Sequence, residues 1–232
     1  MAEVEAITPT LWLLRFPVVN AYLVRTSDGI AIVDTGPAGS EDEIVRALAA
    51  IDATLAELRH IVLTHSHKDH AGSAASLAAM SGAVVLAGSR DARVIAGDAP
   101  EPDPRITPEE RPFYEAVAPT IPPAPPVAVD RVLHEGEVLE WGAPAAKVVE
   151  APGHTPGSIA IYFPDERVLL TGDNIASLGS QPILGPFNVA RGDAIASFHK
   201  LTHLDVDIAC FGHGAPLVGE ASSALRAAAA RL

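Results

Sequence analysis

The sequence predicts one mixed α/β domain over residues 1–232, built as a four-layer αβ/βα sandwich. Strand patterns recur in two halves of the chain, and each half also contributes helix patterns. This pattern indicates the mixed class, and the loose repetition of the halves predicts the layers. Apolar residues make up 48% of the chain and aromatic residues 5%, so the core would consist mostly of aliphatic side chains.

The first half begins with three predicted strands, over residues 11–16, 18–25 and 29–34. A helix follows, for which we expect Ser40 and Glu43 to form a capping box. The remaining elements of this half are a buried strand at 60–64, an alanine-rich helix at 71–80, a strand at 83–87 and a short helix at 89–95.

Residues 97–126 differ in composition, because they contain ten prolines and a cluster of charged residues. We interpret this segment as an ordered insertion or lid within the domain. A helix over 107–117 would have Thr107 as its cap and Pro108 at its first position, with Pro112 in its first turn or at a kink. Phe113 and Tyr114 either face a substrate or pin the insertion to the core.

The second half repeats the strand-rich pattern. Strands are predicted at 127–132, 137–141, 145–150, 158–163 and 168–171. Asp193 is the expected cap of a helix that runs from 194 to about 203, and a strand at 207–211 precedes a terminal helix at 219–232.

The stretch Thr-His-Ser-His-Lys-Asp-His-Ala-Gly, residues 64–72, follows the predicted strand at 60–64. His65 and His67 are two positions apart on extended backbone, so they can point the same way and hold one ion. Asp69 and His70 come where the chain turns into a helix and would suit a second ion. The alternative is a polar loop with solvated histidines, but three histidines and an aspartate in six positions favour metal binding.

Three further polar side chains stand at predicted strand ends, each beside a glycine. His154 lies in Gly-His-Thr-Pro-Gly, Asp173 in Thr-Gly-Asp, and His213 in Gly-His-Gly. With the cluster at 65–70, they form a candidate metal-binding constellation.

These motifs, together with Asp34 after the third strand, resemble the metallo-β-lactamase-fold hydrolase superfamily over nearly the whole chain. The glyoxalase II and lactonase branch is the most similar. The resemblance implies a metallo-β-lactamase fold and a dinuclear site, with two Zn²⁺, or Fe or Mn in their place. The implied ligands are His65, His67 and His154 for the first metal and Asp69, His70 and His213 for the second, with Asp173 bridging both. It also implies that Asp34 steadies the ligand loop, although alone it would be read as a turn residue.

The resemblance implies a hydrolase of a small ester, thioester or lactone, in which a hydroxide bridging the metals attacks a carbonyl and Asp69 carries the proton. Asp173 disfavours β-lactamase activity, because β-lactamases of this fold usually have Cys or Ser there. Lactonases typically carry a Tyr where this chain has Ala176. Only 19 residues follow His213, so we expect the helical C-terminal domain of glyoxalase II to be missing.

Two alternatives remain open. One is a mononuclear iron dioxygenase of persulfides, and the other is a catalytically silent metal-binding protein. Asp69 and Asp173 argue against a silent protein, because a silent site has no evident need of both. Residues 97–126 and 178–191 would line the substrate pocket, where Phe187, Asn188 and Arg191 are plausible contacts.

The formal net charge of −13 and the lack of a Lys or Arg run predict no nucleic-acid partner and no membrane association. The start of the chain lacks a basic, apolar leader, so a cytoplasmic location is expected. The lone Cys210, in an apolar run, is expected to be a buried thiol without a catalytic role. His134, His199 and His203 match none of the motifs and are expected to lie on a turn or a helix surface.

Overall fold

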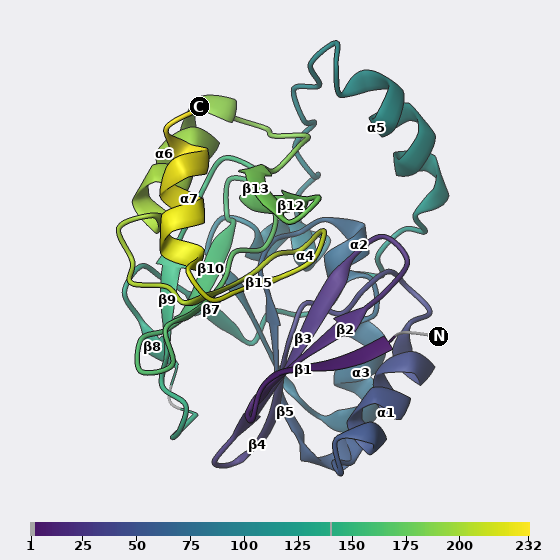
Figure 1. Cartoon of the computed structure of the whole chain (residues 1–232). Coiled ribbons are helices and arrows are strands. Elements are labelled where there is room, and N and C mark those ends of the chain that lie inside the picture. Colours follow the sequence, from purple (N-terminus) through teal and green to yellow (C-terminus); the bar gives the residue numbers. More distant parts are fainter. Residues whose placement is uncertain (1–2, 140) are drawn as a thin grey trace.

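The computed structural model describes residues 3–139 and 141–232. In the described part of the chain, two mixed sheets pack face to face, and helices cover the outer face of each (Figure 1). None of the described helices is long and apolar enough to cross a membrane.

The described residues form a seven-stranded sheet in chain order. Its strands are β1 (Glu3–Thr8), β2 (Leu11–Arg15), β3 (Asn20–Thr26), β4 (Gly29–Val33), β5 (Leu58–Leu63), β6 (Val84–Gly88) and β7 (Arg131–Leu133). Strands β1 to β4 pair antiparallel, whereas β4 to β7 pair parallel. The parallel strands therefore end at one common edge.

The second sheet has six described strands in the order β15-β14-β11-β10-β9-β8. These are β8 (Val138–Leu139), β9 (Ala146–Glu150), β10 (Ile159–Phe163), β11 (Val168–Leu170), β14 (Ile208–Cys210) and β15 (Leu217–Val218). Antiparallel pairing of β10 with both β9 and β11, and parallel pairing of β11 with β14, give β9, β11 and β14 one direction. A hairpin of β12 (Ile175–Leu178) and β13 (Gln181–Leu184) lies beside this sheet.

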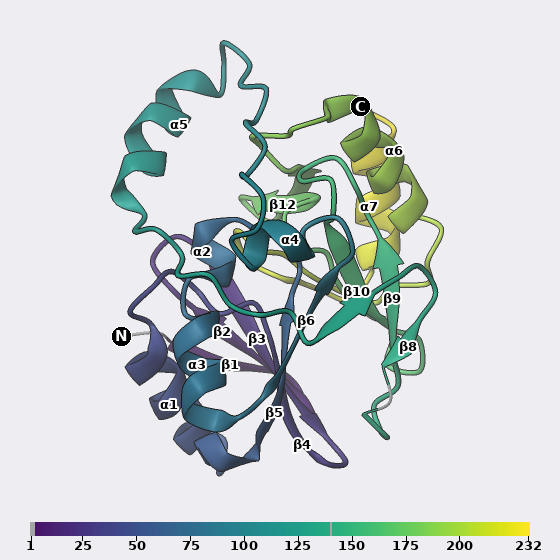
Figure 2. The ribbon, with the colours of Figure 1, turned by 180° about the vertical axis from the view of Figure 1, so that it is seen from behind.

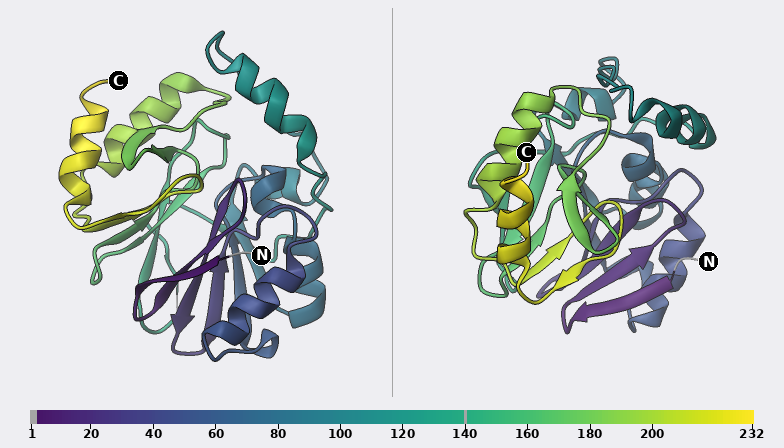
Figure 3. Two further views of the ribbon diagram at one scale, coloured as in Figure 1. Left: turned by 45° about the vertical axis from the view of Figure 1, so that its right-hand side comes forward. Right: turned by 45° about the horizontal axis from the view of Figure 1, so that its top comes forward.

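Three apolar clusters separate four layers. One packs the seven-stranded sheet against α1 (Glu41–Ala50) and α3 (Ala74–Ser81), and another fills the space between the sheets. The third packs the six-stranded sheet against α6 (Arg191–Leu201) and α7 (Ala221–Ala229) (Figures 2 and 3). The predicted four-layer αβ/βα sandwich is thus confirmed, and Cys210 is buried between the sheets as expected.

The remaining helices are short. They are α2 (Lys68–Ala71), α4 (Ala92–Ile95), α5 (Arg111–Val117) and the 3-10 turns η1 (Leu55–Glu57) and η2 (Ala118–Thr120). The helix predicted at 71–80 begins at Ala74 as α3, because a break at Gly72 and Ser73 separates it from α2, which ends at Ala71. An ideal Cβ on Gly72 would lie 2.2 Å from the Ala38 nitrogen, so the loop before α1 packs directly on this break.

Two predicted helix caps do not form as expected. Ser40 occupies the N-cap position of α1, but its side chain makes no capping hydrogen bond. The Ser40 hydroxyl donates to the Pro37 carbonyl at 2.8 Å, and its backbone N–H donates to the Ser73 hydroxyl, so no capping box forms with Glu43. Asp193 lies inside the first turn of α6, which begins at Arg191.

In the insertion, regular helix begins at Arg111 instead of 107. The Thr107 and Glu110 side chains do exchange hydrogen bonds with each other's backbone N–H, at 3.3 and 2.9 Å. Pro112 has no N–H for the carbonyl of residue 108, which delays the regular helical ladder. The expected strands at 127–132 and 137–141 are shorter than predicted, and residue 140 lies outside the described residues.

Candidate metal centre

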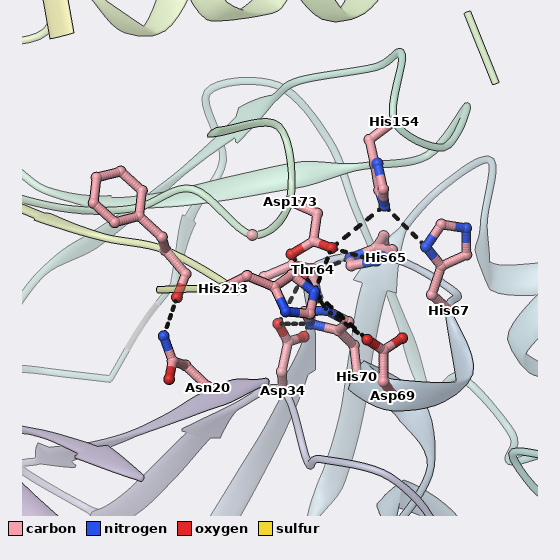
Figure 4. Close-up of polar contacts among 12 residues, drawn as sticks. Asn20, Asp34, Thr64, His65, His67, Asp69, His70, His154, Asp173 and His213 are labelled. Carbon is pink, nitrogen blue, oxygen red and sulfur yellow. Dashed lines mark hydrogen bonds and ion pairs between the residues drawn. The ribbon is translucent and has the colours of Figure 1, made fainter. Parts of the chain in front are cut away.

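The ends of five strands bring the predicted ligands together. Residues 65–70 follow β5, Asp34 follows β4, and His154, Asp173 and His213 follow β9, β11 and β14. The strands that share a direction within each sheet end at the same edge, so ligands far apart in the chain meet there (Figure 4). The structure places all seven predicted ligands in one cluster.

One group consists of His65, His67 and His154, whose ligand atoms lie within 4.8 Å of one another. His154 Nε2 is 2.9 Å from His67 Nδ1. His65 and His154 are buried, whereas His67 faces a cavity. This group is the one predicted for the first metal.

A second group consists of Asp69, His70 and His213, again within 4.8 Å of one another. Asp173 lies between the two groups. Its Oδ2 is 3.5 Å from His154 Nε2 and 3.0 Å from His213 Nε2, and its Oδ1 is 3.3 Å from His70 Nε2. The Asp173 carboxylate therefore reaches ligands of both groups (Figure 4).

The donor atoms of this cluster suit divalent cations. Three buried polar atoms of the cluster, His65 Nε2, His154 Nδ1 and Asp173 Oδ1, have no hydrogen-bond partner among the described residues. The ring nitrogens of His70 and His213 face each other at 3.4 Å. A buried polar atom without a partner is unfavourable, and imidazole and carboxylate groups converging in this way are ordinary ligands for zinc, iron or manganese. The residues present therefore fit a metal pair.

The electrostatics divide the histidines into two kinds. Burial lowers the pKa of His154 to about 3, and burial with the neighbouring His70 and His67 lowers the pKa of His65 well below its usual value. Both shifts favour the neutral imidazole, the form that binds metals. Burial disfavours the charged form of His70 and His213, but Asp173 and the other nearby carboxylates, Asp69 for both rings and Asp34 for His70, together outweigh it and raise both pKa values.

Asp34 anchors the ligand loop. Its carboxylate accepts hydrogen bonds from the Thr64 N–H and hydroxyl, both at 2.8 Å, and lies 2.8 Å from His70 Nδ1. This leaves His70 Nε2 facing the cluster. Asp34 has a φ of 61°, a left-handed conformation that is strained for a non-glycine residue and is typical of functional sites.

A family model described as the metallo-beta-lactamase superfamily matches residues 14–213. The chain belongs to this superfamily. The matched span contains every ligand of both groups.

The chain is similar to several proteins with different names. A hydroxyacylglutathione hydrolase of Methylococcus capsulatus is 29% identical over 73% of this chain and 54% of its own length. The chain therefore spans about half the length of the hydroxyacylglutathione hydrolases that it matches. The uncharacterized protein YobT of Bacillus subtilis is 29% identical over 88% of both chains. A solved metallo-beta-lactamase of Cronobacter sakazakii is 26% identical, with a TM-score of 0.72 over 92% of this chain and 81% of that chain.

Asp91 was not predicted as a site residue, yet it ties together the two ligand loops of the first group. Its buried carboxylate accepts hydrogen bonds from Ser66 N–H at 2.9 Å, Thr155 hydroxyl at 2.6 Å and Gly157 N–H at 2.7 Å. An ideal Cβ on Gly157 would lie 2.3 Å from the Asp91 nitrogen, so only glycine allows this approach. The signal available in the sequence was its place shortly after the end of β6, three residues beyond Gly88, near a strand end as Asp34 is after β4.

The loop that carries His213 is anchored from β3. Asn20 donates to the carbonyls of Phe211 and Gly214 at 2.9 and 2.7 Å, and the Tyr22 hydroxyl donates to Phe211 at 2.8 Å. The His213 Nδ1 contacts the Val18 carbonyl, which leaves Nε2 turned toward Asp173. Neither Asn20 nor Tyr22 was predicted to support the site.

A cavity of about 620 Å³ opens above the ligand cluster and is lined on one side by the insertion. Phe113, Tyr114 and Phe187 line it, whereas Asn188 and Arg191 are not among its lining residues. Asn188 is buried and donates to the Gly185 carbonyl at 2.7 Å. Of the three contacts expected from 178–191, only Phe187 is placed to meet a ligand in this cavity.

Proposed function

We propose that the protein is a dinuclear metal-dependent hydrolase of a small ester, thioester or lactone. The observation that carries this proposal is the position of Asp173 between two complete three-residue ligand groups. Superfamily membership supports it, and the relatives named hydroxyacylglutathione hydrolase favour thioesters among the three substrate classes.

In this proposal, His65, His67 and His154 hold one cation and Asp69, His70 and His213 hold the other. Asp173 contributes to both. Two divalent cations held there would supply a hydroxide nucleophile near neutral pH and would stabilise negative charge on the substrate oxygen. Zinc is our first choice, and the same ligands would accept iron or manganese.

The Asp69 carboxylate is well placed to move a proton. Its Oδ2 lies 3.5 Å from His213 Nε2 and 3.7 Å from His70 Nε2, and its side chain lines the cavity. A carboxylate at the boundary of the ligand cluster and the cavity can accept a proton from the nucleophile and pass it to the leaving group. His67 and His154 line the same cavity, so substrate and ligands share one space.

Two ligand groups favour the dinuclear hydrolase over the persulfide dioxygenase. A single iron would occupy one group and leave the other without a function. A silent binding protein would also have no use for a proton carrier that faces the cavity. The geometry therefore favours the hydrolase over both alternatives.

The test is hydrolysis of aryl esters, acyl thioesters and lactones by zinc-loaded protein. We expect turnover of at least one class, lost with chelator and restored by zinc. His154→Ala should abolish it, while His199→Ala, a histidine outside the cluster, should retain it. Equal rates in the wild type and His154→Ala would contradict the proposal, and bound iron with oxygen uptake on persulfides would support the dioxygenase instead.

A second prediction concerns Asp69. We expect Asp69→Asn to lower kcat by about 10²- to 10⁴-fold, because an amide cannot accept the proton. The measurement is kcat at saturating zinc, with bound metal determined on the same sample. A variant that keeps both its metal and its kcat would exclude Asp69 as the proton carrier.

A further inference from the structure

The cavity above the ligand cluster gathers exposed apolar side chains. Among the described residues, four of the ten large exposed hydrophobic side chains line it: Val18, Phe113, Leu178 and Ile183. Exposed apolar groups that collect in one concave site are typical of a ligand-binding surface. The ligand cluster forms the polar floor, and the apolar groups form the walls.

One wall is the insertion helix α5, which stands over the end of the molecule where β12, β13 and α2 lie (Figures 1 and 2). The Phe113 ring stacks on Phe187 with centroids 5.6 Å apart and planes at 24°, and Tyr114 meets Phe187 edge-on at 5.1 Å. Phe113 is nevertheless 57% exposed. It therefore retains a free apolar surface beside the cavity.

Three hydrogen bonds hold this wall in place from both sides. Arg105 N–H donates to the Asn188 carbonyl at 2.9 Å, and Phe187 N–H donates to the Glu110 carboxylate at 3.3 Å. On the metal side, the Lys68 ammonium donates to the Ala118 carbonyl at 2.6 Å. Because these contacts position α5 before a ligand binds, less free energy is spent on ordering it during binding.

Away from the proposed metal ligands, the charged groups on the cavity walls disfavour an anionic substrate arm. Apart from the proposed metal ligands, the charged lining groups of the described chain are Glu101, Asp103 and Lys68. The Lys68 ammonium donates to the Ala118 carbonyl, and the Glu101 carboxylate lies 3.4 Å from His67 Nε2, so the charge on the cavity walls is mainly negative. A substrate arm that carried carboxylates, as glutathione does, would meet like charge and find no free cation.

We propose that this cavity binds an uncharged, apolar acyl chain, and that Phe113 is a specificity-determining residue for it. The substrate class is then a neutral ester or thioester of a medium-length aliphatic or aryl acid. The proposal rests on the proposed hydrolase function for the identity of the bond that is cleaved. The location of the chain-binding surface rests on the cavity alone.

The test separates binding from catalysis. Neutral N-methyl alkanamides, from butanamide to decanamide, are titrated calorimetrically into the zinc-loaded protein, because amides of this kind resist hydrolysis. We expect the affinity to rise about threefold to fourfold per methylene until the cavity is filled. A carboxylate at the end of the longest chain should weaken binding at least tenfold relative to the neutral amide of equal length.

Two variants locate the surface. Phe113→Asp should flatten the dependence on chain length, whereas Phe113→Leu should preserve it. Met80→Asp is the matched control, because Met80 is 53% exposed on helix α3 and lies outside the cavity, so its dependence should equal that of the wild type. Comparable thermal unfolding of the variants establishes that they are folded.

Each outcome bears on one proposal. Affinity that is independent of chain length, or unaffected by Phe113→Asp, would overturn the acyl-chain site. Chain-length-dependent binding without cleavage of the matching p-nitrophenyl esters or thioesters would support the acyl-chain site and count against the hydrolase. Cleavage without chain-length dependence would support the hydrolase and overturn the acyl-chain site.

Discussion

At the scale of single residues, two carboxylates outside the ligand groups tie the ligand loops together. Asp34 orients His70, and Asp91 joins the loops of His65 and His154 through Ser66, Thr155 and Gly157. Both carboxylates follow parallel strands that flank β5. Ligand geometry is set by such outer contacts, whose loss typically weakens metal binding.

Asp91→Asn tests this role. The amide would present N–H groups to donors that now meet carboxylate oxygens, so the loops should shift apart. We expect zinc affinity to fall about 10- to 100-fold. Competition with a chromogenic chelator measures it.

Asp165→Asn, in an exposed turn, is the control and should bind zinc as the wild type does. Unchanged zinc affinity in Asp91→Asn would show that the hydrogen bonds of Asp91 do not position the ligands.

The sequence predicted some residues of the site and missed others. The seven candidate ligands were predictable because each ligand type stands beside a glycine or in the His-rich stretch at a strand end. Asp91 was not, since it lies in a segment predicted only as a short helix and its partners are 25 and more positions away. Only the fold brings the ends of β6 and β9 close together.

At the scale of elements, the strands and helices of the layers were largely predictable from their apolar periodicity. The hairpin β12–β13 was missed, although Leu178 and Ile183 on it line the cavity. The insertion was predicted to be ordered, but its docking depends on Phe187, whose φ of 62° turns the ring toward α5. No local sequence pattern predicts a positive φ at a phenylalanine.

Hydrogen exchange tests the docking of α5. None of the residues of α5 is buried, whereas α6 buries Ala194, Ser197, Phe198 and Leu201. Elements with few buried contacts open at low free energy, so α5 amides should exchange much faster than those of α6.

Lys68→Met, which removes the hydrogen bond to the Ala118 carbonyl, should accelerate exchange in α5 further and leave that in α6 unchanged. Equal exchange rates in α5 and α6 would contradict the view that only a few hydrogen bonds and ring contacts hold α5 in place.

At the scale of the whole molecule, the ligands come from both sheets. Residues 65–70 follow β5 of the seven-stranded sheet. His154, Asp173 and His213 follow β9, β11 and β14 of the six-stranded sheet. Bound metal would therefore link the two halves of the sandwich. Without it, imidazoles and carboxylates converge in a buried space with no cation between them.

Metal removal should thus lower global stability. With free zinc at about a thousand times its dissociation constant, binding contributes about 4 kcal/mol to the free energy of unfolding. For a chain of this size, that corresponds to a fall in Tm of roughly 10 °C on chelation. Scanning calorimetry measures the fall in Tm, with re-added zinc as the control. An unchanged Tm after chelation would contradict a metal link between the halves.

The central claim is a site for two metals, and metal stoichiometry tests it most directly. Plasma mass spectrometry on protein dialysed against buffered zinc should find about two ions per chain in the wild type. In His213→Ala, which disrupts only the second group, it should find about one. About one ion in the wild type, or none, would contradict the dinuclear site and with it the proposed hydrolytic mechanism.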